Sequence, residues 1–300
     1  MSIIIPTYNR RQDVLSCLSS LFELDYDNFE IIVVDTGSTD ETSYYVKEDY
    51  PSVKLIEYEE VLGVVEARNI GIESSKGDFL LFVDSDNIVA PNLIRELLSL
   101  MEKDETIGFA GPKMYYHSDP GRIWYAGARI NLLTSKTTYI GINEIDHGQY
   151  DEIKEVEHIP NVWMVRKKVI DKIGGLDTIY RMTYEESDWA MRAKKAGFKV
   201  VFCPTAKVWH KIPLLKDQKG LRAVIGFDTP YRIYQMSRNR TIFMKRFASK
   251  FNFIFYFMFF MHMLNIYYLC LFVQFRRFDL IRPLKNGIMD GVKISLRGSI

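Results

Sequence analysis

Short apolar segments alternate with amphipathic segments along the first two thirds of the chain. Apolar runs rich in β-branched residues predict strands at residues 2–5, 30–34, 53–57, 78–83 and 107–111. Apolar residues at helical spacing predict helices at residues 10–22, 64–74 and 91–102. Strands that are apolar on both faces and alternate with helices are typical of a parallel sheet covered on both sides. The sequence therefore predicts an α/β fold.

The pattern is less regular in the middle of the chain. Residues 112–158 are rich in aromatic residues and glycine, and we expect an insert of loops and short strands there. Regular apolar segments, which predict secondary structure, follow at residues 159–165 and 169–173. A helix is expected at residues 185–196, ended by Gly197, and short strands at 198–202 and 206–210.

A long apolar run, residues 251–275, stands near the C-terminus and contains no Asp, Glu, Lys or Arg. As a helix it would be about 37 Å long, more than the roughly 30 Å of a bilayer's hydrocarbon core. Basic residues flank the run on both sides, and His262 and Asn265 lie near its midpoint. A single span, a re-entrant segment and an interfacial helix therefore all remain open. The expected organisation is a folded domain at 1–211, a basic connector at 212–250, the apolar helix, and a basic tail at 276–300.

The charge is divided unevenly along the chain. The net charge is +1, but the part from Tyr231 onward carries +10 and the part before it −9. A basic segment that surrounds an apolar run predicts anionic membrane lipids, and no nucleic acid, as its partner. The three cysteines are widely spaced and form no disulfide framework or metal motif, and no signal peptide precedes the first strand. We therefore expect a membrane-associated protein whose α/β domain lies on the cytoplasmic face.

Polar residues follow three of the predicted strands. Asp84 and Asp86 end the run LLFVDSDNIV, the segment Pro6-Thr7-Tyr8 follows the first strand, and Asp35 follows the second. The carboxyl ends of parallel strands meet at one edge of a sheet, where such folds bind ligands. Two carboxylates two residues apart on a strand lie about 6.6 Å apart and are unfavourable without a cation. Mg²⁺ binds one or two carboxylates together with phosphate oxygens, so a metal–diphosphate site is one interpretation. A solvated turn is the other.

Four separated motifs carry a resemblance to a known family. They are SIIIPTYNR, EIIVVDTGSTDET, GVVEARNIGIESSKGDFLLFVDSDN and GGLDTIYRMTYEESDWAMRAKKAGFKVVFCPTAKVWHK. In this order they resemble an inverting family 2 glycosyltransferase of the GT-A fold, over residues 2–211. The resemblance implies a Rossmann-like, mostly parallel sheet with helices on both faces, followed by a C-terminal hydrophobic helical segment.

The resemblance also implies which residues bind the donor and a metal ion. Asp86 would bind Mn²⁺ or Mg²⁺, with Asp84 at the ribose or the water shell of the metal and His210 at the metal or diphosphate. Thr36 stands where the family often has a second Asp, so the base stays open between UDP, GDP and dTDP sugars. The implied donor-binding residues are Pro6, Thr7, Tyr8, Asp35, Arg68, Asp84 and Ser85.

Catalysis is expected to depend on the segment Tyr-Glu-Glu-Ser-Asp-Trp. Inverting transfer needs a base that removes the proton of the acceptor hydroxyl. The second acidic position matches the family's catalytic carboxylate, so Glu186 is the candidate base, although Asp is commoner there, and Glu185 is the alternative. A charged first turn of a helix would explain the same residues without catalysis.

The acceptor side is predicted less specifically. Trp124 and Trp163 would stack on a sugar or belong to the core. Residues 231–246 are expected along the bilayer, with Arg238 and Arg240 near headgroups or a lipid-linked phosphate. The expected function is inverting, metal-dependent transfer from a nucleotide sugar to a glycan or lipid-linked acceptor, in polysaccharide, glycoprotein or glycolipid biosynthesis. A nucleotidyltransferase and an inactive membrane-anchored binding protein are the alternatives.

Overall fold

The computed structural model describes residues 1–297 and divides into two compact units. The first unit consists of Met1–Arg129, Tyr139–Thr178 and Glu186–Pro213. The second consists of Ile130–Thr138, Ile179–Glu185 and the chain after Pro213. The second unit thus includes two short segments from the middle of the sequence.

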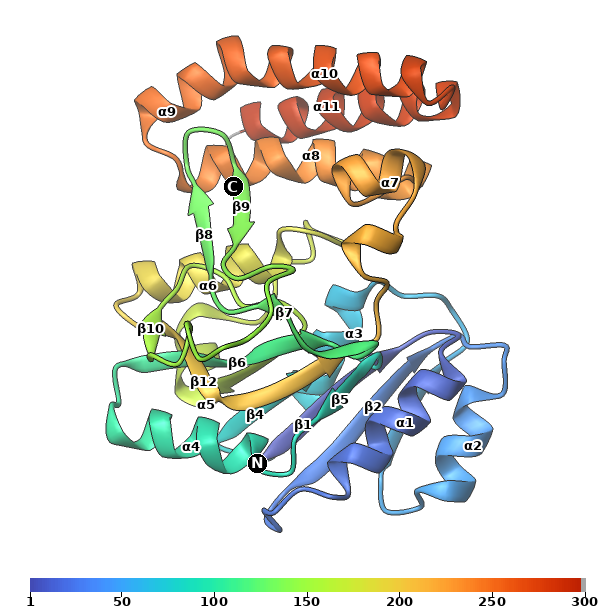
Figure 1. Ribbon diagram of the computed structural model, residues 1–300, viewed down its shortest axis with the longest axis vertical. Helices are drawn as coiled ribbons and strands as arrows, with labels where there is room; N and C mark the ends of the chain where they lie inside the picture. Colours follow the sequence, from blue (N-terminus) through green and yellow to red (C-terminus); the bar gives the residue numbers. More distant parts are fainter. Residues whose placement is uncertain (298–300) are drawn as a thin grey trace. The chain divides into compact units, whose positions relative to one another are not determined.

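The first unit is built on one mixed sheet, shown in Figure 1. Its strand order is β10-β12-β6-β11-β4-β1-β2-β3, and the β1–β2, β2–β3, β1–β4 and β6–β12 pairs are parallel. Strand β11 is antiparallel to both neighbours, β4 and β6. The predicted α/β fold with a mostly parallel sheet is confirmed. The bounds are β1 Ser2–Thr7, β2 Glu30–Thr36, β3 Lys54–Tyr58, β4 Phe79–Val83, β6 Ile107–Tyr116, β10 Lys154–Glu155, β11 Val162–Arg166 and β12 Lys199–His210.

Helices cover both faces of this sheet. In Figure 1, α1 (Arg11–Leu21) and α4 (Leu93–Lys103) lie in front of the sheet and α3 (Val64–Ser74) lies behind it. Apolar residues of the strands pack against these helices in one continuous core. The remaining helices of the first unit are α2 Thr42–Asp49, α5 Lys167–Ile173 and α6 Glu185–Lys195.

Helix α3 approaches the sheet unusually closely at Gly71. A Cβ atom at this position would lie only 2.3 Å from Cγ2 of Ile4 on β1. The absence of a side chain therefore allows the helix backbone to pack directly on the strand. Arg68 lies three residues earlier, on the same face of the helix. The close contact at Gly71 therefore also sets the position of the Arg68 backbone relative to the sheet.

Two parts of the first unit are more regular than the sequence indicates. Strand β6 continues five residues past the predicted end at Gly111 and pairs with β7 (Asp119–Tyr125). All of its residues are buried, so no alternation marks it as a strand. The two strands expected at 198–202 and 206–210 are one strand, β12, whose register shifts between Cys203 and Lys207. Pro204, which has no N–H to donate, lies within this shift.

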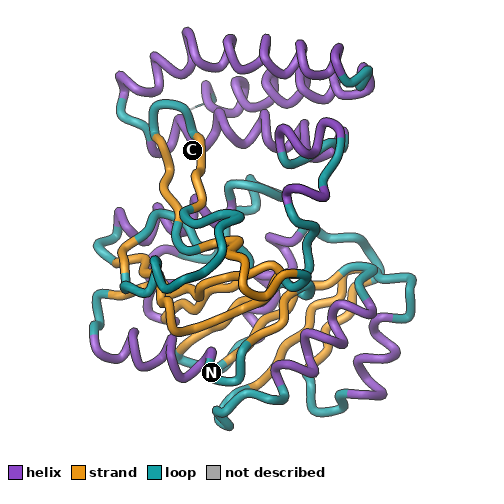
Figure 2. The backbone as a smooth tube through the Cα atoms, in the orientation of Figure 1, coloured by secondary structure: helices purple, strands orange, loops and turns teal. Residues whose placement is uncertain are grey.

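The second unit is mainly helical, as Figure 2 shows. Helix α8 (Pro230–Phe247) packs along α11 (Ile281–Leu296), where Gly287 and Gly291 allow close contact with the α8 backbone. The apolar run forms α9 (Lys250–Phe255), a π-helical turn (Tyr256–Phe260) and α10 (Met261–Gln274). By length and composition this helix, Lys250–Gln274, is able to cross a membrane. The other elements are helix α7 Gly220–Ile225 and short 3₁₀ turns at Leu215–Asp217 and Phe278–Leu280. Residues 130–138 of the hairpin formed by β8 Ala128–Asn131 and β9 Lys136–Tyr139 also belong to this unit.

The sequence did not reveal α8, because its buried positions are largely polar. Gln235, Ser237, Asn239 and Thr241 are all buried, in alternation with less buried residues. An apolar stripe at helical spacing is therefore absent from the first half of the helix. The same applies to α11, a helix with Gly287 and Gly291 on a buried face within the segment expected to be a tail.

Candidate functional site

The two carboxylates of the LLFVDSDNIV motif lie in the turn between β4 and a short strand, β5 (Asn87–Val89). Strand β5 pairs antiparallel with the end of β12, with Asn87 opposite His210. The backbone N–H of Lys211 donates to the carbonyl oxygen of Asp86 at 2.9 Å. This pairing places the His210 imidazole beside Asp86, with 3.4 Å between Nε2 and Oδ1.

Arg68 links Asp84 to Glu186. Its Nη2 donates to Oδ1 of Asp84 at 2.7 Å and to Oε1 of Glu186 at 3.1 Å. The Arg68 side chain is only 1% exposed, and its guanidinium lies over the Trp163 ring at 4.6 Å. A buried arginine between two carboxylates fixes their positions and compensates their charges.

Asn161 extends this network and was not singled out from the sequence. It has φ 58° and immediately precedes β11, beside the end of β4, where its carbonyl accepts from the N–H of Asp84 at 3.1 Å. Its own N–H donates to Oε1 of Glu186 at 3.3 Å, and its Nδ2 lies 2.9 Å from Nε2 of His210. One hydrogen-bonded network thus connects Glu186, Asp84 and His210. The only available signal was an Asn before a strand, which occurs in many turns.

The two aspartates have different electrostatic environments. Burial raises the pKa of Asp84, and the neighbouring charge of Asp86 adds to this, while Arg68 opposes both. Burial also acts to raise the pKa of Asp86, but the hydrogen bond and charge of His210, together with Arg10, outweigh it and leave that pKa lowered. Arg10, also missed in the sequence, lies with Nη1 3.8 Å from Oδ2 of Asp86. Asp86 therefore keeps its negative charge to lower pH than Asp84.

The donor set at Asp86 and His210 fits part of the coordination shell of a divalent ion. Adjacent ligands of an octahedral ion at about 2.1 Å lie about 3 Å from each other, close to the 3.4 Å between Oδ1 and Nε2. Mn²⁺ accepts both carboxylate and imidazole ligands. Within residues 1–297, however, no cluster of three or more His, Cys, Asp or Glu side chains is arranged around a metal position. Asp84, expected at the ribose or the water shell of the metal, is paired with Arg68.

The nucleotide-binding residues expected from the motifs lie at the ends of β1 and β2. Thr7 and Asp35 are neighbours in the sheet register, and Pro6 lies within β1, opposite Val34. The buried Thr7 hydroxyl has no hydrogen-bond partner in the part of the chain that the structure describes. Asp35 accepts from the N–H of Ser38 at 3.1 Å and from the Ser43 hydroxyl at 2.5 Å, which fixes its carboxylate.

Two further predicted residues flank this part of the site. Tyr8 follows β1 and is exposed, so its ring is accessible to a ligand. Ser85 is buried between the two carboxylates of the turn.

Glu186 has a second neighbour in the buried His158. The Nε2 atom of His158 lies 3.8 Å from Oε2 of Glu186, and the imidazole also contacts the Ser187 hydroxyl at 3.1 Å and the Tyr139 hydroxyl at 3.3 Å. Burial lowers the pKa of His158 to about 3. A neutral imidazole therefore lies next to the candidate base.

The structure separates the two tryptophans expected on the acceptor side. The Trp124 ring lies against the His210 imidazole, with 4.6 Å between centroids, and so borders the candidate metal position. Trp163 is 2% exposed and stacks on Phe82 in the core, so it is not accessible to a sugar. Of the two alternatives predicted for Trp163, stacking on a sugar and a place in the core, the structure supports the core, where the ring lies against the Arg68 guanidinium.

The remaining candidates belong to the second unit. Glu185 is buried at the start of α6. Arg238 donates to the carbonyl oxygen of Ile179 at 2.6 Å and to Oδ1 of Asn239 at 2.7 Å, so protein groups already bind its guanidinium.

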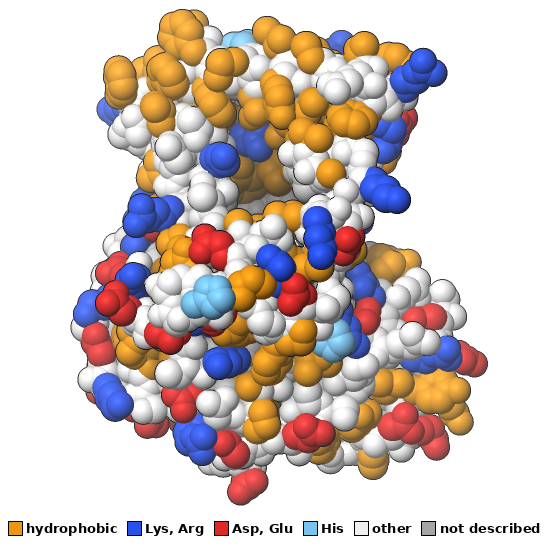
Figure 3. Space-filling view, viewed as in Figure 1, with side chains coloured by type: hydrophobic (Ala, Val, Ile, Leu, Met, Phe, Trp, Pro, Cys, Tyr) orange, Lys and Arg blue, Asp and Glu red, His pale blue; other side chains and the backbone are white. Residues whose placement is uncertain are grey.

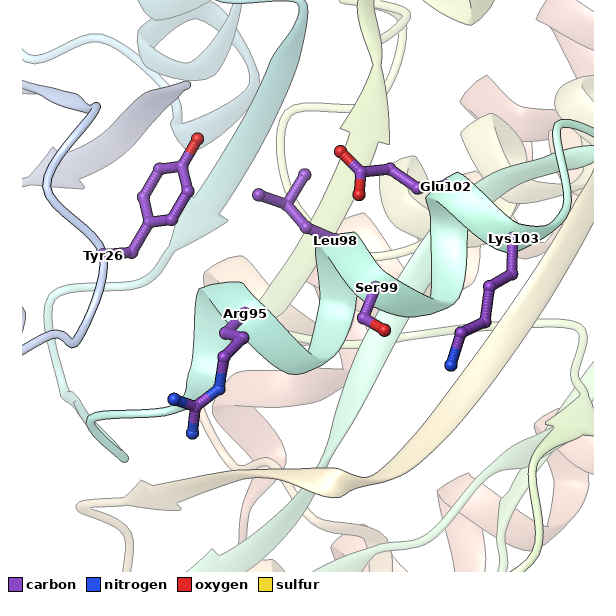
Figure 4. Close-up of a pocket in the computed structure, with 6 residues that line it drawn as sticks. All are labelled: Tyr26, Arg95, Leu98, Ser99, Glu102 and Lys103. Atoms are coloured by element: carbon purple, nitrogen blue, oxygen red, sulfur yellow. The ribbon is translucent and has the colours of Figure 1, made fainter.

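A separate hollow of about 410 Å³ lies along α4 and is drawn in Figure 4. None of the candidate site residues lines it, and its charged side chains are exposed on the surface of α4. We assign it no role. Its lining residues are Tyr26, Arg95, Leu98, Ser99, Glu102 and Lys103.

Comparison with known proteins identifies the family. The family model described as glycosyl transferase family 2 matches residues 2–174, which include Arg68, the carboxylate turn and Asn161. The chain belongs to glycosyl transferase family 2. Its mostly parallel sheet also matches solved structures of the GT-A type. The mannosyltransferase PcManGT from Pyrobaculum calidifontis, in complex with GDP-Man and Mn²⁺, has a TM-score of 0.59 at 17% identity, covering 100% of this chain and 76% of that one.

Two curated relatives show how far the sequence similarity extends. An uncharacterized glycosyltransferase of Haemophilus influenzae is 31% identical over 196 residues, 64% of this chain and 61% of that protein. The Escherichia coli enzyme WfgD, named as a UDP-Glc:α-D-GlcNAc-diphosphoundecaprenol β-1,3-glucosyltransferase, is 35% identical over 105 residues, 35% of this chain and 42% of WfgD. The matches thus span less than two thirds of either relative.

Proposed function

We propose that this family 2 glycosyltransferase domain transfers a sugar from a nucleoside diphosphate sugar to an acceptor hydroxyl, with a divalent metal ion and inversion at the anomeric carbon. The observation that carries the proposal is the network at the ends of the strands. Asp86 and His210 lie 3.4 Å apart. Asn161 connects His210 to Glu186, and Arg68 connects Glu186 to Asp84. This arrangement would bring the proposed metal ligands, the proposed base and fixed hydrogen-bond donors together in one place.

The donor side of the site is assigned as follows. Asp86 and His210 would hold Mn²⁺ or Mg²⁺, which when bound neutralises negative charge on the departing nucleoside diphosphate. Thr7, Tyr8 and Asp35 would contact the base and ribose, supported by the buried Thr7 hydroxyl that lacks a partner within residues 1–297. PcManGT, of the same fold, binds GDP-Man and Mn²⁺, which supports a nucleotide sugar and a divalent ion here.

Glu186 is assigned as the base. Arg68 and the N–H of Asn161 both donate to its Oε1 and so orient the carboxylate. The positive charge of Arg68 favours the ionised form that a base requires. Glu186 would take the proton of the acceptor hydroxyl as that oxygen attacks the anomeric carbon. Attack on the face opposite the leaving diphosphate inverts the configuration.

The acceptor is proposed to be a lipid-linked glycan, as in the synthesis of cell-surface polysaccharides. The name of WfgD gives a sugar on diphosphoundecaprenol as its acceptor. An acceptor with such a lipid is reached only at a membrane surface. The long apolar helix of the second unit provides a means of membrane attachment.

We propose that this helix lies in the membrane interface and does not span the bilayer. One face, including Tyr256, Tyr268 and Phe272, packs on α8 and α11. Large apolar side chains on the other face are exposed, as the orange surface over α9 and α10 in Figure 3 illustrates. Helix α11 carries charged residues at intervals, so a bundle that includes it is poorly suited to the hydrocarbon core. The exposed residues include Phe251, Ile254, Met258, Phe259, Met263, Ile266 and Val273.

Thermal-shift screening against UDP, GDP and dTDP sugars, with and without Mn²⁺, tests the proposal. We expect one nucleotide sugar to raise the Tm only when Mn²⁺ is present. Transfer from that donor to a lipid-diphosphate-linked acceptor, with analysis of the anomeric configuration, then tests the reaction and its stereochemistry. Retention of configuration would contradict the role of Glu186. Release of pyrophosphate from a nucleoside triphosphate and a sugar phosphate would instead indicate a nucleotidyltransferase.

A further inference from the structure

Arg240 on α8 differs in its surroundings from Arg68 and Arg10, which both lie beside carboxylates. It is partly buried, and its Nε and Nη2 donate to the hydroxyls of Tyr184 at 3.2 Å and Tyr268 at 3.3 Å. No carboxylate within residues 1–297 lies within ion-pair distance of its guanidinium. Helix α8 carries five Lys or Arg residues and no Asp or Glu. A guanidinium withdrawn from water without a counterion is unfavourable unless an anion binds it.

The tyrosines around Arg240 hold it in place without neutralising it. Tyr184 also contacts Ser135, with 3.2 Å from its hydroxyl to the Ser135 carbonyl oxygen, and Tyr256 contacts Thr241 at 3.1 Å. Burial acts to lower the pKa of Arg240, but Tyr184 and Tyr268 more than compensate, so its pKa is raised and the group stays charged. Two of the five N–H groups of the guanidinium donate to the tyrosine hydroxyls. The other N–H groups can donate to a further acceptor.

We propose that Arg240 is the anion-binding residue of a site for a phosphate ester carried on a lipid. A guanidinium binds phosphate oxygens through parallel N–H donors, and the tyrosine hydroxyls contribute further hydrogen bonds. The exposed apolar helix in the same unit, α9–α10, supplies the surface on which a lipid chain would lie. The proposal takes the lipid-linked acceptor as the source of the phosphate, and in this respect it rests on the proposed function. A bilayer headgroup has the same chemistry and is the other source.

Arg238, two residues away on α8, is not assigned to this site. Its Nη1 already donates to the Ile179 carbonyl oxygen and to Asn239 Oδ1. It therefore supports the segment before α6. The expectation that Arg238 also lies near headgroups or a lipid-linked phosphate stays a prediction, and the site proposed here uses Arg240.

The test compares binding of farnesyl phosphate with binding of farnesol, which lacks the phosphate, to the full chain. We expect Arg240→Gln to weaken farnesyl phosphate binding about tenfold to a hundredfold, the loss of one or two charge-assisted hydrogen bonds, and to leave farnesol binding unchanged. Arg240→Lys, which keeps the charge without the planar donors, should retain part of the affinity and serves if the glutamine variant does not fold. Arg232→Gln removes an exposed charge from the same helix and is the matched control.

Vesicles distinguish the two sources of phosphate. If the source is the acceptor, Arg240→Gln and Arg232→Gln should bind equally to phosphatidylcholine vesicles with added phosphatidylglycerol. A loss specific to Arg240→Gln on these vesicles, with farnesyl phosphate binding retained, would overturn the acceptor assignment in favour of a headgroup. Wild-type affinity for both probes in Arg240→Gln, or an equal loss of farnesyl phosphate and farnesol, would overturn the site. Metal-dependent stabilisation by the nucleotide sugar should persist in every variant, and its absence in the wild type would instead contradict the proposed function.

Discussion

Arg68 and Glu186 are 118 residues apart in the sequence and are joined by a hydrogen bond of 3.1 Å. The same guanidinium nitrogen binds Asp84 at 2.7 Å, so Arg68 ties the proposed base to the carboxylate turn. The guanidinium also packs on the face of the buried Trp163 ring. Because one buried side chain holds both carboxylates, the relative position of Glu186 and Asp84 is set before any ligand binds.

This arrangement makes a specific prediction for Glu186. Glu186→Gln keeps an oxygen for Arg68 and Asn161 but cannot accept a proton, so kcat should fall about 10²- to 10⁴-fold. The Mn²⁺-dependent Tm increase with the donor should remain, and Glu186→Asp should retain more activity than the glutamine variant. Steady-state kinetics and thermal shift on the same preparations measure both effects. A larger loss of kcat in Glu185→Gln than in Glu186→Gln would move the role of base to Glu185.

The metal assignment is tested at Asp86. Asp86→Asn removes the anionic ligand beside His210, and Mn²⁺ affinity in the presence of the nucleotide sugar should fall by at least about a hundredfold. The measurement is a Mn²⁺ titration of the Tm at fixed donor concentration. Asp171→Asn, which removes a carboxylate from the surface of α5 where it pairs with Lys167, is the control for lost charge. Equal Mn²⁺ dependence in the two variants would rule out Asp86 as a ligand.

The parts of the site that the sequence revealed are those fixed by local chain order. Asp84 and Asp86 follow a buried strand, so the rule that ligands bind at the carboxyl ends of parallel strands was enough to locate them. Asn161 joins the network only because β11 is antiparallel to β4, a pairing that no local pattern reveals. The role of Trp163 could not be predicted either, because a buried and an accessible tryptophan look alike in sequence.

Packing of α3 gives a prediction at Gly71. A methyl group there would lie 2.3 Å from Cγ2 of Ile4, so Gly71→Ala should push the helix away and cost about 1–3 kcal/mol of stability. Because Arg68 lies on the same helix face, kcat should fall as well. Ile4→Ala is itself destabilising because Ile4 is buried, but in the double variant Gly71→Ala with Ile4→Ala the combined loss of stability should be smaller than the sum of the two single losses, a non-additive result. Gly121→Ala, where no atom lies within 4 Å, is the control.

Urea unfolding and activity assays measure these changes. Additive losses in the double variant would show that the two residues do not share the contact. Unchanged kcat in a destabilised Gly71→Ala protein would show that Arg68 keeps its position when α3 moves.

The buried His158 predicts how stability depends on pH. Burial lowers its pKa from 6.5 to about 3, so the folded protein keeps the imidazole neutral where the unfolded chain is protonated. A depressed histidine pKa means that its contribution is fully present above pH 6.5 and is lost as the pH falls from 6.5 toward 3. The loss amounts to about 1.4 kcal/mol per pH unit within that window. In His158→Gln this pH-dependent part should disappear, whatever constant loss of packing the substitution causes.

The measurement is the difference in unfolding free energy between wild type and His158→Gln at neutral pH and at mildly acidic pH. The wild type should lose about 2–3 kcal/mol relative to the variant over two pH units below 6.5. His147→Gln, at an exposed position, is the control. The opposing influence is Glu186, whose Oε2 lies 3.8 Å from His158 Nε2 and favours the imidazolium. If that ion pair prevails over burial, the wild type will gain stability relative to His158→Gln as the pH falls, and the histidine beside the proposed base is charged.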